Sequence, residues 1–281
     1  MRVGIDFGSS TTKAVAVDDS GAIVRAEQIK AKKAPKIGTL LRRLGFQEYS
    51  DIESLSLTGT GAHRCSDAVE IGRSVPIHYV PEFDAVGLGG LALTGLSKAL
   101  VVSLGTGTAF VVAEDGNTRH IGGTGIGGGT LLGLGPRLFG DDDIYVISGI
   151  AEHGDLSNVD LLISDITDVP IPGLPMHATA ANFAKVSPNA ADADFALGLI
   201  NMLFQTIGTL AVFACGDKRE SDVIVTGTMA SLPQAERIFG ELTALYGTRF
   251  VIPEQPAFAT ALGAVLGARR TGNALLTSTE N

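Results

Sequence analysis

Cysteine is scarce in this chain of 281 residues, and the two cysteines that it has, Cys65 and Cys215, lie far apart. We therefore expect no disulfide framework, and neither cysteine belongs to a CxxC pair of the kind that holds a metal. Both are predicted to be reduced, buried thiols. A secretory leader is not expected either, because an apolar strand begins at the first residues. Together these absences predict a cytoplasmic protein.

Basic residues are fewer than acidic ones, with 21 lysines and arginines against 30 aspartates and glutamates, and the formal net charge is −9. They gather only at residues 30–36, which we interpret as a solvated loop. A nucleic-acid partner is therefore disfavoured. Uninterrupted apolar runs are also lacking, because the longest, residues 197–215, contains Asn201, Gln205 and Thr206. This pattern predicts a core helix and no membrane span.

Glycine and apolar residues, by contrast, are abundant. The chain holds 36 glycines, 45% of its residues are hydrophobic, and its mean hydropathy is +0.28. Such a chain is predicted to be globular and long enough for two domains with a large core. The glycines gather in three places, which favours phosphate-binding loops over a flexible linker.

The most informative of these places follows the first predicted strand and is called here the first hairpin. The strand ends at Asp6, and it is followed by Gly8, Ser9, Ser10, Thr11, Thr12 and Lys13. Glycine lets the backbone approach a ligand closely, and turn N–H groups and hydroxyls bind phosphate oxygens. Asp6 can hold Mg²⁺ directly or through water, and Lys13 either pairs with phosphate or faces solvent. The simpler alternative is an ordinary glycine–serine turn.

Apolar periodicity predicts a mixed α/β chain in which one series of elements occurs twice. In the first series we expect strands at residues 3–6, 12–18, 23–29, 52–57 and 77–80, and helices at 37–44, 62–71 and 83–93. In the second we expect strands at 100–103, 109–114, 118–121, 222–225 and 249–252, and helices at 131–139, 193–215, 232–245 and 257–269. Each series opens with a strand, a glycine turn and another strand. Two such turns facing each other across a cleft suit a polyphosphate.

Three later glycine motifs each follow an apolar strand: the second turn, Gly105-Thr106-Gly107; the glycine loop, residues 122–130 with Gly127, Gly128 and Gly129; and Gly227. The second turn exposes N–H groups and a hydroxyl. The glycine loop opens a helix, and N–H groups at a helix N-terminus favour an anion. The last glycine lets a base or ribose lie on the backbone. Any one of these turns can be structural, but all of them in this order point to a nucleotide site.

Four segments carry a resemblance to a known family: residues 3–13, residues 81–85 (PEFDA), residues 102–108, and residues 122–134 (GGTGIGGGTLLGL). They resemble the type II pantothenate kinases, within the superfamily of actin, sugar kinases and heat-shock chaperones. The likeness spans most of the chain, and its last segment is the most distinctive. It implies two duplicated actin-like, ribonuclease H-like lobes with a nucleotide cleft between them. The lobes would be residues 1–96 and 97–281, with the final helix packing back on the first.

The resemblance also implies a function, the ATP- and Mg²⁺-dependent phosphorylation of pantothenate to 4'-phosphopantothenate at the start of coenzyme A biosynthesis. It implies Glu82 as the general base for the alcohol proton, with Asp84 as the nearby alternative. Asp6 and the glycine and hydroxyl turns would hold Mg-ATP. The implied partners are pantothenate or a related small alcohol, coenzyme A or an acyl-CoA as a feedback ligand, and a second copy of the chain through residues 193–215.

One departure from the family concerns the acceptor. Thr106, Arg119, His120 and Gly123 are the candidate substrate-binding residues, but His120 stands where the family usually carries an arginine. Its neighbour Arg119 would face the other side of a strand. Two alternatives therefore stay open: a kinase of another small alcohol such as an amino sugar, and an ATPase activator or regulator of a partner enzyme. Dehydratase activators carry cysteines for an iron–sulfur cluster, and this chain has only two cysteines.

Overall fold

The structure, a computed structural model, describes residues 1–30, 35–65, 67–216 and 222–277 and contains two five-stranded sheets of the same topology. The first sheet has the order β3-β2-β1-β4-β5, with β1 (Arg2–Phe7), β2 (Thr11–Val17), β3 (Ile23–Lys30), β4 (Ser54–Thr58) and β5 (Ile77–Tyr79). The second has the order β8-β7-β6-β11-β12, with β6 (Lys98–Leu104), β7 (Thr108–Glu114), β8 (Asn117–Thr124), β11 (Val223–Thr226) and β12 (Phe250–Val251). The prediction of a duplicated α/β fold is confirmed.

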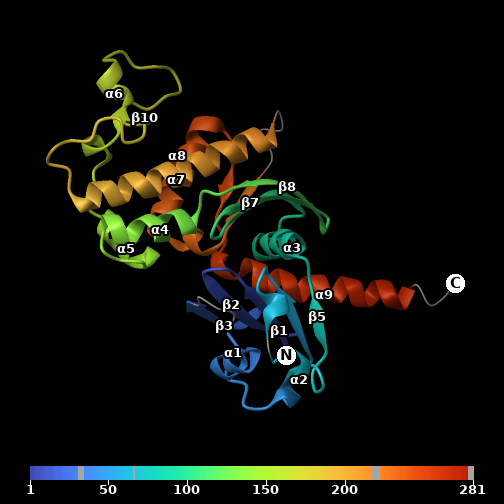
Figure 1. The fold of residues 1–281 in the computed structure, drawn as a ribbon. Coiled ribbons are helices and arrows are strands. Elements are labelled where there is room, and N and C mark those ends of the chain that lie inside the picture. The colour runs from blue at the N-terminus through green and yellow to red at the C-terminus, as the bar shows by residue number, and fades with distance from the viewer. Residues whose placement is uncertain (31–34, 66, 217–221, 278–281) are drawn as a thin grey trace.

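Helices surround both sheets (Figure 1). They are α1 (Ile37–Arg43), α2 (Ala68–Ile71), α3 (Glu82–Thr94), α4 (Gly128–Leu138), α5 (Ile144–Ala151), α6 (Ile163–Ile166), α7 (Asp192–Cys215), α8 (Pro233–Tyr246) and α9 (Ala259–Thr277). A small pair of strands, β9 (Leu161–Leu162) and β10 (Thr179–Ala181), lies between α5 and α7 in the chain. Residues 31–34, which belong to the predicted basic loop, lie outside the described residues.

The middle strand of the first sheet, β1, is buried along its whole length. Val3, Ile5 and Phe7 enter the core beneath α1, and the alternate residues project from the other face of the sheet. Asp6 stands directly opposite Lys13 in the antiparallel register of β1 and β2. Directly opposed residues project from the same side of a sheet, so this register brings the two charges together.

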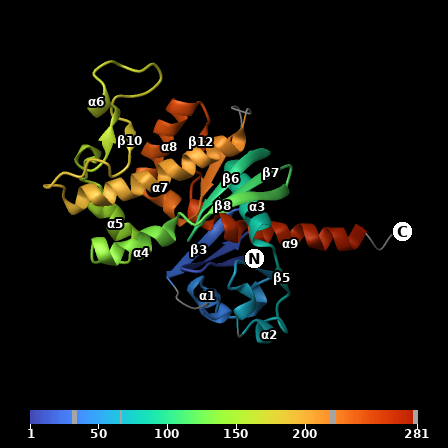
Figure 2. The ribbon, with the colours of Figure 1, turned by 45° about the horizontal axis from the view of Figure 1, so that its top comes forward.

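Two helices, α3 and α9, lie side by side between the sheets (Figures 1 and 2). α9 follows the second sheet in the chain but packs on the first, where Ala261 and Val265 join Val15 of β2 in one apolar cluster. α3 precedes the second sheet but packs on it, where Val86 joins Val101 of β6. Each half of the chain therefore supplies a helix to the sheet of the other.

Glycines let α3 and α9 approach until backbone meets backbone. A Cβ on Gly89 of α3 would collide with the carbonyl oxygen of Ala259, and a Cβ on Gly263 of α9 would collide with that of Ala85. No flexible side chain lies at either contact to give way, so only glycine fits this helix pair.

The second half of the chain has the larger apolar core, built from α5, α7 and α8 against the second sheet. Phe204 of α7 and Phe239 of α8 are buried there, with ring centroids 5.4 Å apart. By length and composition α7 is apolar enough to cross a membrane, yet 61% of its most apolar window is buried inside the fold. It packs as the core helix that the sequence predicted.

The predicted helix at residues 62–71 is not continuous. A 3-10 turn, Ala62–Arg64, is followed by an extended residue before α2 begins. The carboxylate of Asp67 accepts hydrogen bonds from the backbone N–H groups of Ile37 and Gly38, at 3.1 and 3.0 Å. These bonds satisfy the start of α1, where N–H groups lack partners within the helix. A contact from a distant segment thus accompanies the break, and local periodicity does not reveal it.

Candidate active site

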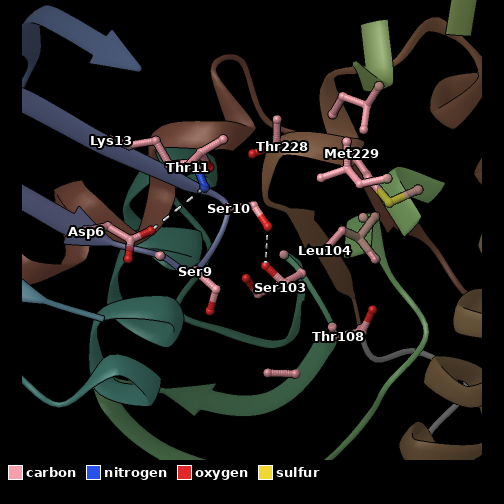
Figure 3. A pocket seen from close by; sticks show the side chains of 18 of the residues that line it. Asp6, Ser9, Ser10, Thr11, Lys13, Ser103, Leu104, Thr108, Thr228 and Met229 are labelled. Carbon is pink, nitrogen blue, oxygen red and sulfur yellow. Dashed lines mark hydrogen bonds and ion pairs between the residues drawn. The ribbon is translucent and has the colours of Figure 1, made fainter. Parts of the chain in front are cut away.

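A cavity of about 870 Å³ lies between the two sheets, and Figure 3 shows side chains from both halves facing it. It brings together most of the predicted site, namely Asp6, Gly8, Ser9, Ser10, Thr11, Lys13, Glu82, Gly105, Thr106, Gly107, His120, Gly123 and Gly128. The first hairpin and the second turn, far apart in the sequence, therefore face one space.

The first hairpin presents its hydroxyls unequally. Ser9, Ser10 and Thr11 line the cavity, as does Lys13. Thr12 lies outside the wall, is 1% exposed, and has no hydrogen-bond partner for its hydroxyl among the described residues. Alternation along β2 accounts for the difference, because successive side chains point to opposite faces. We expected Thr12 at the phosphates, but its side chain lies on the face of the sheet that packs in the core.

Asp6 and Lys13 form an ion pair at the cavity wall, with 4.0 Å between Lys13 Nζ and Asp6 Oδ2 and both side chains about nine-tenths buried. Burial raises the pKa of Asp6, and the positive charge of Lys13 opposes that rise. No group of three or more His, Cys, Asp or Glu in the described ranges could hold a metal by itself. A single carboxylate in the wall of a cavity does fit Mg²⁺, which completes its coordination with water and phosphate oxygens.

The second turn connects β6 to β7 and faces the first hairpin. The hydroxyl oxygens of Ser10 and Thr106 lie 3.0 Å apart across the cavity. The backbone N–H groups of Gly128 and Gly129 donate to the carbonyl oxygens of Gly105 and Thr106, each at 2.8 Å. The N-terminus of α4, expected to bind an anion directly, therefore uses these donors to hold the second turn in place.

Three of the predicted glycines lie outside the cavity wall: Gly127, Gly129 and Gly227. A Cβ on Gly127 or Gly129 would lie 2.8 Å from the carbonyl oxygen of Thr106. Gly227 has φ of 93°, a conformation that favours glycine, and packs against the end of β6. These three glycines therefore pack closely against the backbone of residues 104–107, behind the cavity wall.

Glu82 is the first residue of α3 and faces the cavity. Loss of hydration in the cleft raises its pKa, the negative charge of Asp6 raises it further, and the positive charge of Lys13 opposes both. Asp84 lies outside the wall, and its carboxylate accepts a hydrogen bond from the Thr118 hydroxyl of β8. Of the two carboxylates that the sequence offered as a base, Glu82 is the one in the cavity.

His120 and Arg119 are separated by the alternation of β8. His120 lines the cavity and stacks on Phe83, with ring centroids 3.8 Å apart and planes inclined by 2°. Arg119 is exposed and lies outside the wall. Gly123, at the end of the same strand, lines the cavity.

Several cavity residues were missed by sequence reasoning. Lys30 of β3 binds Asp142, 112 positions away, with 2.7 Å between Lys30 Nζ and Asp142 Oδ1. Gln28 and Tyr145 hydrogen bond through their side chains beside this pair. The acidic run at residues 141–143 was the available signal, but nothing local indicates which strand it meets. The wall further includes Thr60, Ser103, Leu104, Thr108, Ala109, Thr124, Leu132, Asp143, Ile144, Thr228 and Met229.

Solved structures share the architecture of this chain. The chain matches the activator of 2-hydroxyisocaproyl-CoA dehydratase from Clostridium difficile with bound ADPNP, with TM-score 0.67, 18% identity and coverage of 100% of this chain and 98% of that one. It matches a ROK family glucokinase from Streptomyces griseus in complex with glucose and AMPPNP, with TM-score 0.58, 13% identity and coverage of 96% and 99%. The fold is that of the actin-like ATPases.

The family follows from sequence comparison. The Fumble family matches residues 94–235. Type II pantothenate kinase of Staphylococcus aureus strain USA300 is 30% identical over 279 residues, which cover 94% of this chain and 98% of that protein, and the enzyme of Staphylococcus haemolyticus is 28% identical. The chain therefore belongs to the type II pantothenate kinase family. It is an ATP-dependent small-molecule kinase, and both predictions from the sequence are confirmed.

Proposed function

We propose that this chain transfers the terminal phosphoryl group of ATP to the primary hydroxyl of pantothenate, giving 4'-phosphopantothenate, the first step of coenzyme A biosynthesis. The carrying observation is that Glu82, Asp6 and both phosphate-binding turns line one cavity. Relatives named type II pantothenate kinase, which align with 94% of the chain, support the acceptor. The two lobes are assigned to residues 1–96 and 97–281, with α9 packed back on the first.

In the proposed reaction Glu82 accepts the proton of the acceptor hydroxyl. The acceptor oxygen then bonds to the γ-phosphorus as the bond between that phosphorus and the bridging oxygen of ADP breaks. The raised pKa of Glu82 makes its carboxylate a stronger base than an exposed glutamate. Most residues of the site need only position the reactants, because phosphoryl transfer depends chiefly on alignment and charge neutralisation.

The phosphates are assigned to the donors of the two turns. Gly8, Ser9, Ser10 and Thr11 offer N–H groups and hydroxyls from the first lobe, and the second turn offers Thr106 from the other. Lys13 supplies positive charge beside them. Mg²⁺ bound with ATP neutralises phosphate charge, and Asp6 is the residue that would hold it. Thr106, His120 and Gly123 are assigned to the acceptor side, next to Glu82.

The cysteine content weighs against the activator alternative. Iron–sulfur clusters are held by several cysteine thiolates. This chain has two cysteines, Cys65 in the first half and Cys215 at the end of α7. The alternative of another small alcohol differs only in the acceptor.

We assign the protein to the cytoplasm. We also assign it as a homodimer through α7, where Phe213 is 72% exposed. Its feedback ligand in this assignment is coenzyme A or an acyl-CoA.

The test is ADP release from ATP and Mg²⁺ by the purified protein, with and without pantothenate. We expect pantothenate to stimulate release, and Glu82→Gln to lower the stimulated rate by about a hundredfold, the scale of general-base catalysis. Glu236→Gln is the matched control, because Glu236 also lies in the first turn of a helix but is exposed and outside the cavity. A folded, ATP-binding protein that pantothenate does not stimulate would sink the assignment and point to another acceptor.

A further inference from the structure

We propose that the Phe83–His120 stack is a positioning device that fixes the first turn of α3, and with it the Glu82 carboxylate, on strand β8 of the second sheet. This role rests on the proposed function of Glu82 as the base. His120 is then a positioning residue that acts through Phe83, and the feature that matters is its flat ring.

The Phe83 ring stacks on the His120 ring at the cavity wall. The two rings are nearly parallel, with planes inclined by 2° and centroids 3.8 Å apart. Phe83 is 41% exposed, so no core packing encloses it, although it is a large apolar side chain beside a polar cavity. No described residue hydrogen bonds to the His120 ring. Stacking on an aromatic face is therefore the interaction that orders both side chains.

A second contact joins the same two elements. The Asp84 carboxylate accepts a hydrogen bond from the Thr118 hydroxyl. Thr118 and His120 are two residues apart in β8 and so share one face of the strand. The next turn of α3 is also close, since a Cβ on Gly87 would lie 2.6 Å from the Thr118 methyl carbon. Consecutive side chains of α3 thus reach alternate side chains of one strand.

The first turn of α3 is held on two sides, because Ala85 packs on α9 while Phe83 and Asp84 contact β8. It begins after Pro81, which provides no side-chain cap for the unpaired N–H groups of the helix start. Glu82 comes immediately before the anchored pair, so a shift of Phe83 moves the base. The anchors belong to the second sheet, which also carries the second turn. Glu82 and the second turn are therefore both attached to the second sheet, whereas Asp6 and Lys13 belong to the first.

The test compares His120→Ala, which removes the ring, with His120→Phe, which keeps a flat ring. We expect His120→Ala to lower kcat about tenfold with the KM for ATP within about twofold of wild type, because small misplacements of a reacting group are costly. His120→Phe should recover part of the kcat that His120→Ala loses, because it keeps the flat ring against Phe83. His153→Ala is the control, because His153 is exposed and outside the cavity.

Hydrogen exchange provides a readout that does not depend on activity. Backbone amides of residues 85–88, the first to be hydrogen bonded within α3, should exchange faster in His120→Ala and at the wild-type rate in His120→Phe. Wild-type kcat and exchange in His120→Ala would overturn the proposal, and so would a His120→Phe protein as impaired as His120→Ala, which would assign the role to the ring nitrogens. If exchange responds as expected while no acceptor is phosphorylated, the proposed function fails and the positioning role stands.

Discussion

At the residue scale, the site depends on three charges that influence one another. Asp6 on β1 forms an ion pair with Lys13 on β2. Both charges act on Glu82: lost hydration and the charge of Asp6 raise the pKa of Glu82, and the charge of Lys13 lowers it. A base must be deprotonated to act, so activity should fall as the pH drops through the raised pKa of Glu82. The acid limb of the rate profile should therefore lie above 4.5, the ordinary pKa of a glutamate.

Replacing Lys13 tests the sign of this coupling. Lys13→Met removes the positive charge that stabilises the Glu82 carboxylate, so the pKa of Glu82 rises and the acid limb of kcat/KM for pantothenate moves to higher pH. Lys185→Met, which breaks an exposed pair with Asp165 instead, should leave the limb in place. The measurement is the pH profile of both variants beside wild type, and movement of the Lys13→Met limb to lower pH would contradict the assignment.

At the element scale, the contact of α3 with α9 holds the two halves together, and it depends on small residues. The helices meet at Gly89 and Gly263, where a Cβ on either would collide with a backbone carbonyl of the other helix. Residue chemistry alone does not distinguish these glycines from the other helical glycines of the chain. Their surroundings do, since a Cβ on Gly240 of α8 would meet nothing within 4 Å.

Alanine substitution should separate the two kinds of glycine. We expect Gly263→Ala to lower the free energy of unfolding by about 1–3 kcal/mol, the usual cost of overpacking, because the helices must move apart. Gly240→Ala should raise it by about 0.5–1 kcal/mol, since alanine restricts the unfolded chain without a clash. Urea denaturation of both variants measures this. Equal effects on stability would show that the helix contact is not as close as described.

At the scale of the whole molecule, contacts between the two halves cross the cavity. Lys30 of β3 reaches Asp142 at 2.7 Å and Asp143 at 3.9 Å, and the Ser10 and Thr106 hydroxyls meet inside. Actin-like enzymes that bind substrates between two lobes must open to exchange them. Contacts that cross the cleft should therefore affect the rate of ligand exchange more than the stability of the fold.

We expect Lys30→Met to speed release of a fluorescent ATP analogue about threefold with little change in Tm, because exposed ion pairs add little to stability. The difference from wild type should shrink at high salt, which screens the pair. Lys98→Met is the matched control: its pair with Glu114 is similarly exposed but lies within the second sheet. Stopped-flow fluorescence measures the release rate of the analogue from each variant. An equal effect of both variants would show that the Lys30–Asp142 pair does not slow release.

Local patterns predicted the elements well where local forces form them. The strands of the first hairpin and the core helix α7 follow their apolar periodicity closely. The prediction of a continuous helix at residues 62–71 was wrong, and within this segment the Asp67 carboxylate accepts hydrogen bonds from the start of α1. The glycine loop was recognised from composition, but composition did not indicate that the N–H groups of Gly128 and Gly129 donate to the second turn. In both cases a backbone group found its partner in a distant segment.

The sequence by itself determined the duplicated α/β fold, the family, and most of the residues around the cavity, because turn chemistry, strand alternation and glycine loops are local properties. Only the tertiary structure decided which of them face the ligand space. It turned Thr12 and Arg119 away, placed Glu82 and not Asp84 in the cavity wall, and joined Lys30 to Asp142. The physical reason is that burial, pKa and ion pairing depend on neighbours in space, and these come from segments far apart along the chain.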